Sequence, residues 1–359
     1  MLSSIYRILL CGIILFFLFS CTEKDQNSIM INPNKILEIS SKNIDDKLFF
    51  SEISSLGLDS NRNIYIADKK NYSIKKFSID GNFITAFGKQ GNGPGEFDGY
   101  FDLCIGKEEI YITETQTGFI HSFDLDGNFI ERKKAGNRAP QSLKALSNGN
   151  FVGVLLNIKV KDKKTFFVSE LNIFNKDYET IKTLLEKEVQ FNKDNPSLNL
   201  KDLFPIYQVY NKKIYAAIIS DEIFQIKAFD ENGLVIKNYK KGHIRAKMDE
   251  EEIKAAKNIN LEIKNKKKKV SLPEFYKNSI MGMWIDKKEN LWVVESTNSH
   301  KEKMRLLCFK DTLNYSNLSI DILNKFEDSD TQSNLYLSNN LIFLIDNNSL
   351  KVEVYDYDY

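Results

Sequence analysis

The chain has 359 residues, 42% of them hydrophobic, and its 50 basic and 49 acidic side chains almost cancel. This length allows a large buried core, and all-β barrels and propellers of this size often form one domain. A nearly neutral chain has no global field to attract nucleic acid, so we expect no nucleic-acid partner.

The first twenty residues have the pattern of a bacterial lipoprotein signal. Arg7 precedes an apolar run over residues 8–19, which is too short to cross a bilayer comfortably. The run ends in Leu18-Phe19-Ser20-Cys21, which matches a lipobox: an apolar position, a small residue and the cysteine that is lipidated. We predict a signal peptide over residues 1–20 and a lipid anchor at Cys21, which makes a membrane the first partner. The alternative is an ordinary signal peptide, or an uncleaved anchor, with a chance cysteine.

The segment after the anchor, residues 21–34, shows no periodicity, and we interpret it as a flexible tether. Glu23 and Asp25 resemble signals that send some lipoproteins to the outer leaflet of the outer membrane. We therefore expect a location in the cell envelope, at the outer membrane, with the leaflet left open. The folded domain is predicted over residues 35–359.

Cys104 and Cys308 are the cysteines left in the folded part once Cys11 leaves with the signal and Cys21 is acylated. Each lies in an apolar, strand-like run. We expect buried thiols that pack as small hydrophobic groups, and a disulfide or a nucleophile is the alternative.

Two separate stretches of the chain repeat with the same offset of 46 residues. Residues 63–68 are echoed by residues 109–114, and residues 74–84 by residues 120–130, including a shared Asp-Gly-Asn-Phe-Ile. Each unit reads as four short strands, with Asp-Gly as the hairpin turn before the fourth. A four-stranded unit of about 40–50 residues is typical of a propeller blade.

Looser copies of the unit follow downstream, with blade boundaries between residues 135 and 210 left open. They lie at residues 148–174, 213–234, 283–295 and 340–356. Six copies predict an all-β, six-bladed β-propeller of four-stranded blades. The last copy ends at its third strand, and an unpaired strand at residues 35–39 precedes the first copy. We predict that this N-terminal strand completes the sixth blade and removes its exposed edge.

These repeats resemble the NHL family. The resemblance rests on residues 63–68, Ile74-Lys75-Lys76-Phe77, Asp80-Gly81, Phe87-Gly88 and the connector at residues 91–97. Over its whole length the chain resembles the six-bladed β-propeller lipoproteins of bacterial envelopes. The resemblance implies a fold and hardly any activity.

The connector Gly91-Asn92-Gly93-Pro94-Gly95 could be mistaken for a phosphate-binding loop. Phosphate cradles need converging backbone N–H groups at a helix N-terminus, and Pro94 removes one donor. A strand follows the connector in the pattern, so we predict a turn between two blades.

An acidic residue follows or ends the second strand in four copies. These residues are Asp68, Glu114, Glu295 and Asp346. Carboxylates at related positions could ring a channel and hold a cation, which makes them the weak candidates for metal ligands. Their recurrence favours hydrogen bonds within their own turns, so we expect no metal and no cofactor. The three histidines, His121, His243 and His300, stand apart without a second ligand at zinc spacing.

The segment at residues 239–278, between blades four and five, departs most from the repeat. Acids at 249–252, followed by apolar residues at 253, 256 and 263, predict a short helical insertion of about three turns. A lysine run follows it, at Lys264 and at Lys266, Lys267, Lys268 and Lys269. The run is either a solvated helix end, or part of a lid whose lysines contact an anionic ligand or partner.

A second long connector, at residues 186–205, carries five apolar residues that we expect to pack on the ring. They are Phe191, Leu198, Leu200, Leu203 and Phe204. If both long connectors emerge on the same face, that face is the place to look for a ligand.

Three functions stay open from the sequence. The first is a binding or interaction module for a protein, small-molecule or glycan ligand, since propellers present loops on a rigid ring and no catalytic motif stands out. The second is an accessory subunit of an outer-membrane uptake complex, which an apolar patch on one face would favour. The third is a propeller-type hydrolase or lyase with a channel metal.

Overall fold

The structure is a computed structural model of the full chain. It describes residues 29–31, 33–40, 49–191, 203–218, 220–250, 253, 276–296, 305–310, 315–320, 335–338, 341–347 and 349–356.

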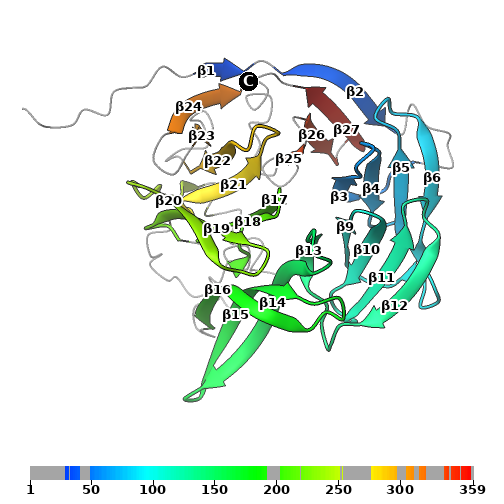
Figure 1. The fold of residues 1–359 in the computed structure, drawn as a ribbon, viewed down its shortest axis with the longest axis horizontal. Helices are drawn as coiled ribbons and strands as arrows, with labels where there is room; N and C mark the ends of the chain where they lie inside the picture. The colour runs from blue at the N-terminus through cyan, green and yellow to red at the C-terminus, as the bar shows by residue number, and fades with distance from the viewer. Residues whose placement is uncertain are drawn as a thin grey trace, which may run out of the picture.

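The described residues form six antiparallel blades arranged as a ring around a central axis (Figure 1). Blade one holds β3 (Ile53–Leu58), β4 (Ile64–Asp68), β5 (Ser73–Phe77) and β6 (Phe83–Phe87). Blade two holds β9 (Phe101–Ile105), β10 (Glu109–Glu114), β11 (Phe119–Asp124) and β12 (Phe129–Lys134). Blade three holds β13 (Gln141–Ala145), β14 (Phe151–Lys161), β15 (Lys164–Phe174) and β16 (Thr180–Phe191). Blade four holds β17 (Tyr207–Tyr210), β18 (Lys213–Ala217), β19 (Phe224–Asp230) and β20 (Val235–Lys241).

The two remaining blades take strands from both ends of the chain. Blade five holds β21 (Ile280–Ile285), β22 (Leu291–Glu295), β23 (Arg305–Phe309) and β24 (Tyr315–Ile320), with β1 (Ile29–Ile31) at its edge. Blade six holds β25 (Leu335–Ser338), β26 (Leu341–Asp346), β27 (Lys351–Asp356) and β2 (Asn34–Ser40). The six-bladed, four-stranded prediction is therefore confirmed.

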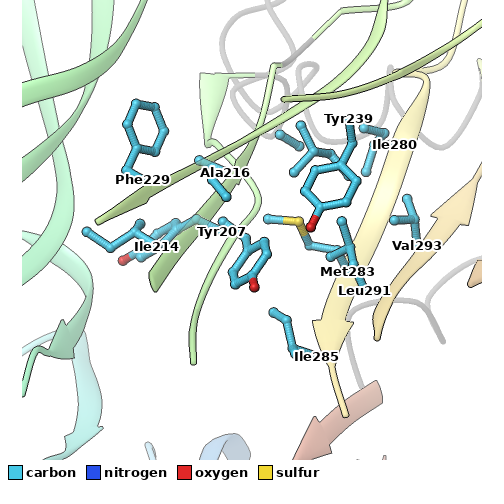
Figure 2. Packing of buried hydrophobic residues seen from close by; sticks show 14 of the residues in the cluster. Tyr207, Ile214, Ala216, Phe229, Tyr239, Ile280, Met283, Ile285, Leu291 and Val293 are labelled. Atoms are coloured by element: carbon cyan, nitrogen blue, oxygen red, sulfur yellow. The ribbon is translucent and has the colours of Figure 1, made fainter. Parts of the chain in front are cut away.

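The Ile-Tyr-Ile pattern belongs to the second strand of a blade, which lies in the interior of the ring. All five residues of β4 and of β22 are buried. A blade packs both of its faces on neighbouring blades, so a strand in its middle meets apolar side chains on both sides. Figure 2 shows this packing between blades four and five, where Tyr207 and Met283 belong to one buried cluster.

The N-terminal strand closes the ring as predicted. β2 pairs antiparallel with β27, with Glu38 opposite Glu353, and becomes the outer strand of blade six. Lys35 on β2 bonds the Glu353 carboxylate at 2.7 Å, so the two ends of the chain are joined by side chains as well as by backbone.

The predicted tether over residues 21–34 is wrong for its last part. Ile29–Ile31 form β1, which pairs parallel with the outer strand β24 of blade five, and Asn34 already begins β2. The physical reason is the open edge of β24, whose backbone N–H and C=O groups accept a further strand. The N-terminal segment thus lies across blades five and six, and the residues before 29 lie outside the described part of the chain.

Blade three extends further than the other blades (Figure 1). Its strands β14, β15 and β16 have 11, 11 and 12 residues. The predicted connector at 186–205 is therefore partly wrong, because β16 continues to Phe191. Leu203 is buried and Phe204 packs against the core, as expected, while Leu198 and Leu200 lie outside the described residues.

The strand order gives the ring two different faces. One face carries the turns that join the first strand of each blade to the second and the third strand to the fourth. We call it the turn face. The opposite face carries the turns between second and third strands and the links from each blade to the next. We call it the connector face. The described ends of both long connectors lie on the connector face, because each connector follows an outer strand and precedes the next inner strand.

The helical insertion is not found in the part of the chain that the structure describes. The Ile253 N–H donates to the Asp249 carbonyl at 3.0 Å, and residues 254–275, with Lys264 and the run Lys266–Lys269, lie outside the described ranges. No helix among the described residues has the length and apolar character to cross a bilayer. Cys104 and Cys308 are both buried, and no disulfide joins them.

Candidate functional site

The turn face is built from tight turns in which one aspartate carboxylate organises the backbone. Asp59 accepts hydrogen bonds from the backbone N–H of Asn61 at 2.9 Å and of Asn63 at 2.8 Å. Asp124 and Asp286 accept the same pair of bonds from residues two and four positions later. An aspartate can make these local bonds because its short side chain reaches the backbone two residues on.

Two of these turns also hold a buried aromatic side chain. Asp59 accepts a hydrogen bond from the Tyr65 hydroxyl at 3.0 Å, and Asp286 accepts one from the Trp292 indole N–H at 2.9 Å. Tyr65 and Trp292 are fully buried, so the aspartates give these polar groups an acceptor inside the core.

The turn face also links blade to blade. Lys76 of blade one donates to the Leu125 carbonyl of blade two at 2.8 Å, and Lys213 of blade four bonds Glu289 of blade five at 2.7 Å. The polar groups of this face are thus used in holding the ring together.

On the connector face, the acids at the ends of the second strands are bound within the protein. Asp68 is fully buried; it accepts the backbone N–H groups of Ser51 and Glu52 and bonds the Lys75 ammonium at 2.7 Å. This carboxylate anchors the chain that enters blade one.

Glu114 has the same place in blade two and a different set of partners. It accepts bonds from the Asp98 N–H at 2.6 Å and from the Thr117 hydroxyl at 2.9 Å, and lies 3.3 Å from His121 Nε2. Burial raises the pKa of Glu114, but the hydrogen bonds from His121, Asp98 and Thr117 outweigh it and hold that pKa below its ordinary value.

Glu295 in blade five is bonded from the neighbouring blade. Lys241, the last residue of β20, lies 2.7 Å from Glu295 Oε1, and His243 Nδ1 lies 3.3 Å from the same oxygen. Asp346 accepts the Ser349 N–H within its own turn at 3.0 Å.

The four recurring acids therefore stay with separate blades. Across the described ranges, no group of three or more His, Cys, Asp or Glu side chains is placed to hold a metal ion. His121 and His243 lie with different glutamates, and His300 lies outside the described residues.

The glycine-rich connector lies between blades one and two, as predicted. Its short strands β7 (Lys89–Gln90) and β8 (Glu96–Phe97) pair parallel, and the Gly93 N–H donates to the Glu96 carboxylate at 2.8 Å. The Gly93 N–H is thus bonded to a carboxylate of the connector itself.

The inner strands carry a group of ionisable residues next to the central axis. Asp102 on β9 accepts the Ser142 N–H of blade three at 3.0 Å. Burial raises the pKa of Asp102, although the bond from Ser142 opposes the shift. Burial lowers the pKa of Lys144 on β13, and the negative charge of Asp102 partly offsets the shift. The Lys144 ammonium lies 5.8 Å from the centre of the Tyr207 ring on the next blade.

A cavity of about 430 Å³ opens on the connector face at blades two and three. Its lining comes from the start of β9, the β10–β11 turn, the link between the blades and the start of β13. The lining residues are Tyr100, Thr115, Gln116, Arg138 and Gln141. A volume within about 300–1,000 Å³ with a few convergent polar groups is what small-molecule sites typically show.

None of these lining residues was singled out from the sequence. They stand outside the repeated strand pattern, on segments separated by up to about forty positions, and no motif links them. Only Arg138, an isolated cation in a link between blades, offered a signal, and the position of that link was itself undetermined. The predicted contacts Lys266, Lys267, Lys268 and Lys269 lie outside the described residues.

The comparisons with known proteins agree with this architecture. A model of a family described as 6-bladed beta-propeller, DUF5128, matches residues 44–312. No protein with a curated description matches the chain.

Solved structures with the same fold are distant in sequence. A Bacteroides fragilis protein named "Putative exported protein" shares 12% identity at a TM-score of 0.51, over 90% of this chain and 94% of its own. A duf4221 family member from Bacteroides vulgatus shares 11% identity at a TM-score of 0.48, and the match covers 93% of this chain and 99% of that one. The virginiamycin B lyase of Staphylococcus aureus, in a structure with quinupristin, shares 12% sequence identity at a TM-score of 0.43. The match covers 85% of this chain and 94% of the lyase chain. At such identities the likeness shows the fold alone.

Proposed function

The chain belongs to this six-bladed β-propeller family, and we propose that it is an envelope-anchored binding module whose ligand site is the cavity on the connector face. The site is lined by side chains of Tyr100, Thr115, Gln116, Arg138 and Gln141. The repeats of blades one and two support an NHL-type lineage for the ring.

The observation that carries this proposal is the unused hydrogen-bonding capacity of the cavity. The Arg138 guanidinium and the amides of Gln116 and Gln141 line the cavity, and among the described residues none of them has an ion-pair or hydrogen-bond partner. Polar groups that are not bonded within the protein are available to a polar ligand, which can supply the missing bonds.

A blocked cavity tests the proposal directly. Gln116→Trp places an indole in the cavity mouth, and Lys107→Trp is the matched control on the turn face of the same blade, where the lysine side chain is 90% exposed. The wild type and both variants are screened by thermal shift against envelope-derived glycans, peptides and metabolites. Ligands that stabilise the wild type and the control but not Gln116→Trp support the site. Equal stabilisation of all three proteins contradicts it.

The lipid anchor at Cys21 is part of the proposal. Cys21 precedes β1 by eight residues, so an acylated Cys21 would attach the membrane close to the blades that β1 and β2 join. In cells fed radiolabelled palmitate we expect label on the wild type and none on Cys21→Ser. Export to the cell envelope, at the outer membrane, predicts that the wild type fractionates with that membrane.

An accessory role in an outer-membrane uptake complex is a second candidate, favoured by one surface. Leu234 and the first residues of β20, Val235 and Ile236, are exposed by 60%, 55% and 45%. Val235→Asp would then abolish co-purification with the complex and leave small-ligand binding unchanged.

A propeller-type hydrolase or lyase with a channel metal is the third candidate. The opposed pKa shifts of Asp102 and Lys144 near the axis are of the kind that functional sites show. Stoichiometric metal in the purified protein, lost in Asp102→Asn, would support this candidate. A metal-free protein that binds ligand in the cavity supports the binding module.

A further inference from the structure

The connector-face cavity has a chemically selective lining. Its lining residues include one guanidinium, two amides and one phenol ring, and no carboxylate. Such a wall has a single cation, too few for a ligand with several phosphates. It matches a polar ligand with one negative charge and several hydroxyl groups.

Arg138 supplies the charge. It is exposed, and within the described residues it has no carboxylate at ion-pair distance, whereas Arg245 pairs with Asp221 and Arg132 donates to the Asn92 carbonyl. Lys69, whose ammonium lies over the Tyr100 ring, is 3.6 Å from Glu52. A planar guanidinium binds a carboxylate through two parallel hydrogen bonds, so Arg138 is suited to an anionic group on the ligand.

Tyr100 supplies a platform. Its ring is 42% exposed, and the Lys69 ammonium lies 4.6 Å from the ring centre. The negative charge of Asp102 raises the pKa of Tyr100 to about 12, so the phenol stays neutral at physiological pH. An aromatic ring with a polar edge can pack against the C–H face of a sugar while its hydroxyl takes part in hydrogen bonds.

The amides of Gln116 and Gln141 complete the site. Each offers donors and an acceptor, and neither amide has a hydrogen-bond partner among the residues that the structure describes. Together the two amides can bind more than one hydroxyl group at once.

We infer that this cavity binds an acidic sugar, with its carboxylate on Arg138, its ring on Tyr100 and its hydroxyl groups on Gln116 and Gln141. This inference rests on the proposed function and gives it a ligand class. A cavity of about 430 Å³ accommodates a single sugar residue or the end of a short chain.

Ligand-observed NMR and calorimetry test the inference on the full chain purified in detergent. The probes are glucuronate, galacturonate, mannuronate and N-acetylneuraminate, each beside its neutral counterpart glucose, galactose, mannose or N-acetylmannosamine. We expect at least one acid to bind tenfold or more tightly than its counterpart. We expect Arg138→Gln to remove that preference, and Arg62→Gln, an exposed arginine on the turn face, to retain it.

Two further variants separate the charge from the platform. Tyr100→Leu is expected to weaken the acidic and the neutral sugar alike, whereas Arg138→Lys keeps the charge without the planar fork and retains part of the preference. Because the Tyr100 hydroxyl also bonds Asp102, thermal unfolding of both variants checks that the fold is retained.

The outcomes are distinct for the two proposals. If no acid binds in preference to its neutral counterpart, or if Arg138→Gln leaves the preference intact, the inference is wrong. If the Gln116→Trp screen then still finds a ligand of another class, the binding module stands without the acidic sugar. If that screen also finds nothing that depends on the cavity, the proposed function fails with it.

Discussion

The two faces of the ring use their polar side chains in different ways. On the turn face, Asp59 and Asp286 bind their own backbone and a buried aromatic side chain, and lysines link one blade to the next. On the connector face the buried acids are also bound, but in the cavity wall the exposed Arg138 has no carboxylate at ion-pair distance among the described residues.

This difference separates stability from binding. A polar group that is bonded within the protein contributes to folding and has nothing left for a ligand. A polar group without a partner costs free energy in the empty protein and is available to a ligand. Substitutions on the turn face should therefore lower stability, and substitutions in the cavity should change binding with little loss of stability.

The largest effect is expected at Asp286. Asp286→Ala removes the bonds to the backbone and leaves the buried Trp292 indole without its Asp286 acceptor, so we expect a loss of about 2–4 kcal/mol in the free energy of unfolding. Urea denaturation measures it. Asp124→Ala is the matched control, because its turn has the same backbone bonds and no recorded bond to a buried aromatic group, and it should lose less than half as much. Equal losses of unfolding free energy in the two variants would show that the hydrogen bond from the Trp292 indole contributes little to stability.

A smaller effect is expected from the charge of Glu114. Its pKa in the folded state lies below the ordinary value of 4.5, so its stabilising contribution is present above that pH and is lost as the pH falls through the folded-state pKa. Glu114→Gln should lose about 1–2 kcal/mol at pH 7 and show a flatter decline in stability below pH 4.5.

The control for this pH profile is on the other face. The pKa of Asp124 is also lowered, through its bonds with Asn128, but this carboxylate is close to water. Asp124→Asn should flatten the acid decline much less than Glu114→Gln does. If Asp124→Asn flattened the acid decline in stability more than Glu114→Gln does, the stabilising charge would belong to Asp124 on the turn face and not to Glu114 on the connector face.

The smallest change in stability is expected at Thr115. Thr115→Val keeps the shape and removes a buried hydroxyl that has no partner among the described residues, so stability should stay within about 0.5 kcal/mol or rise. Thr117→Val in the same turn removes a hydrogen bond to Glu114 and should cost about 1 kcal/mol without changing affinity. Thermal unfolding and calorimetry on the two variants give both quantities. A loss of stability at Thr115 as large as at Thr117 would mean that its hydroxyl is used within the protein.

Much of the ring could be predicted because its information is local. The strand alternation and the Asp-Gly turn repeat at a constant offset, and the closing strand at residues 35–39 follows from a last copy that lacks one strand. The wrong predictions concern segments whose structure depends on a strand that is distant in the sequence. Ile29–Ile31 look like tether in sequence and become β1 because the edge of β24 is open to them, and β16 runs on to Phe191 because β15 continues beside it.

By itself, the sequence determined the number of blades and the order of their strands, since both follow from a local strand-and-turn pattern that recurs along the chain. Only the tertiary structure decided which side chains meet at the cavity. Tyr100, Thr115 and Arg138 belong to separate segments of two blades, and they converge because the strands of neighbouring blades end on the same face of a curved ring. Convergence of this kind depends on how the blades pack, and no local pattern in the chain encodes it.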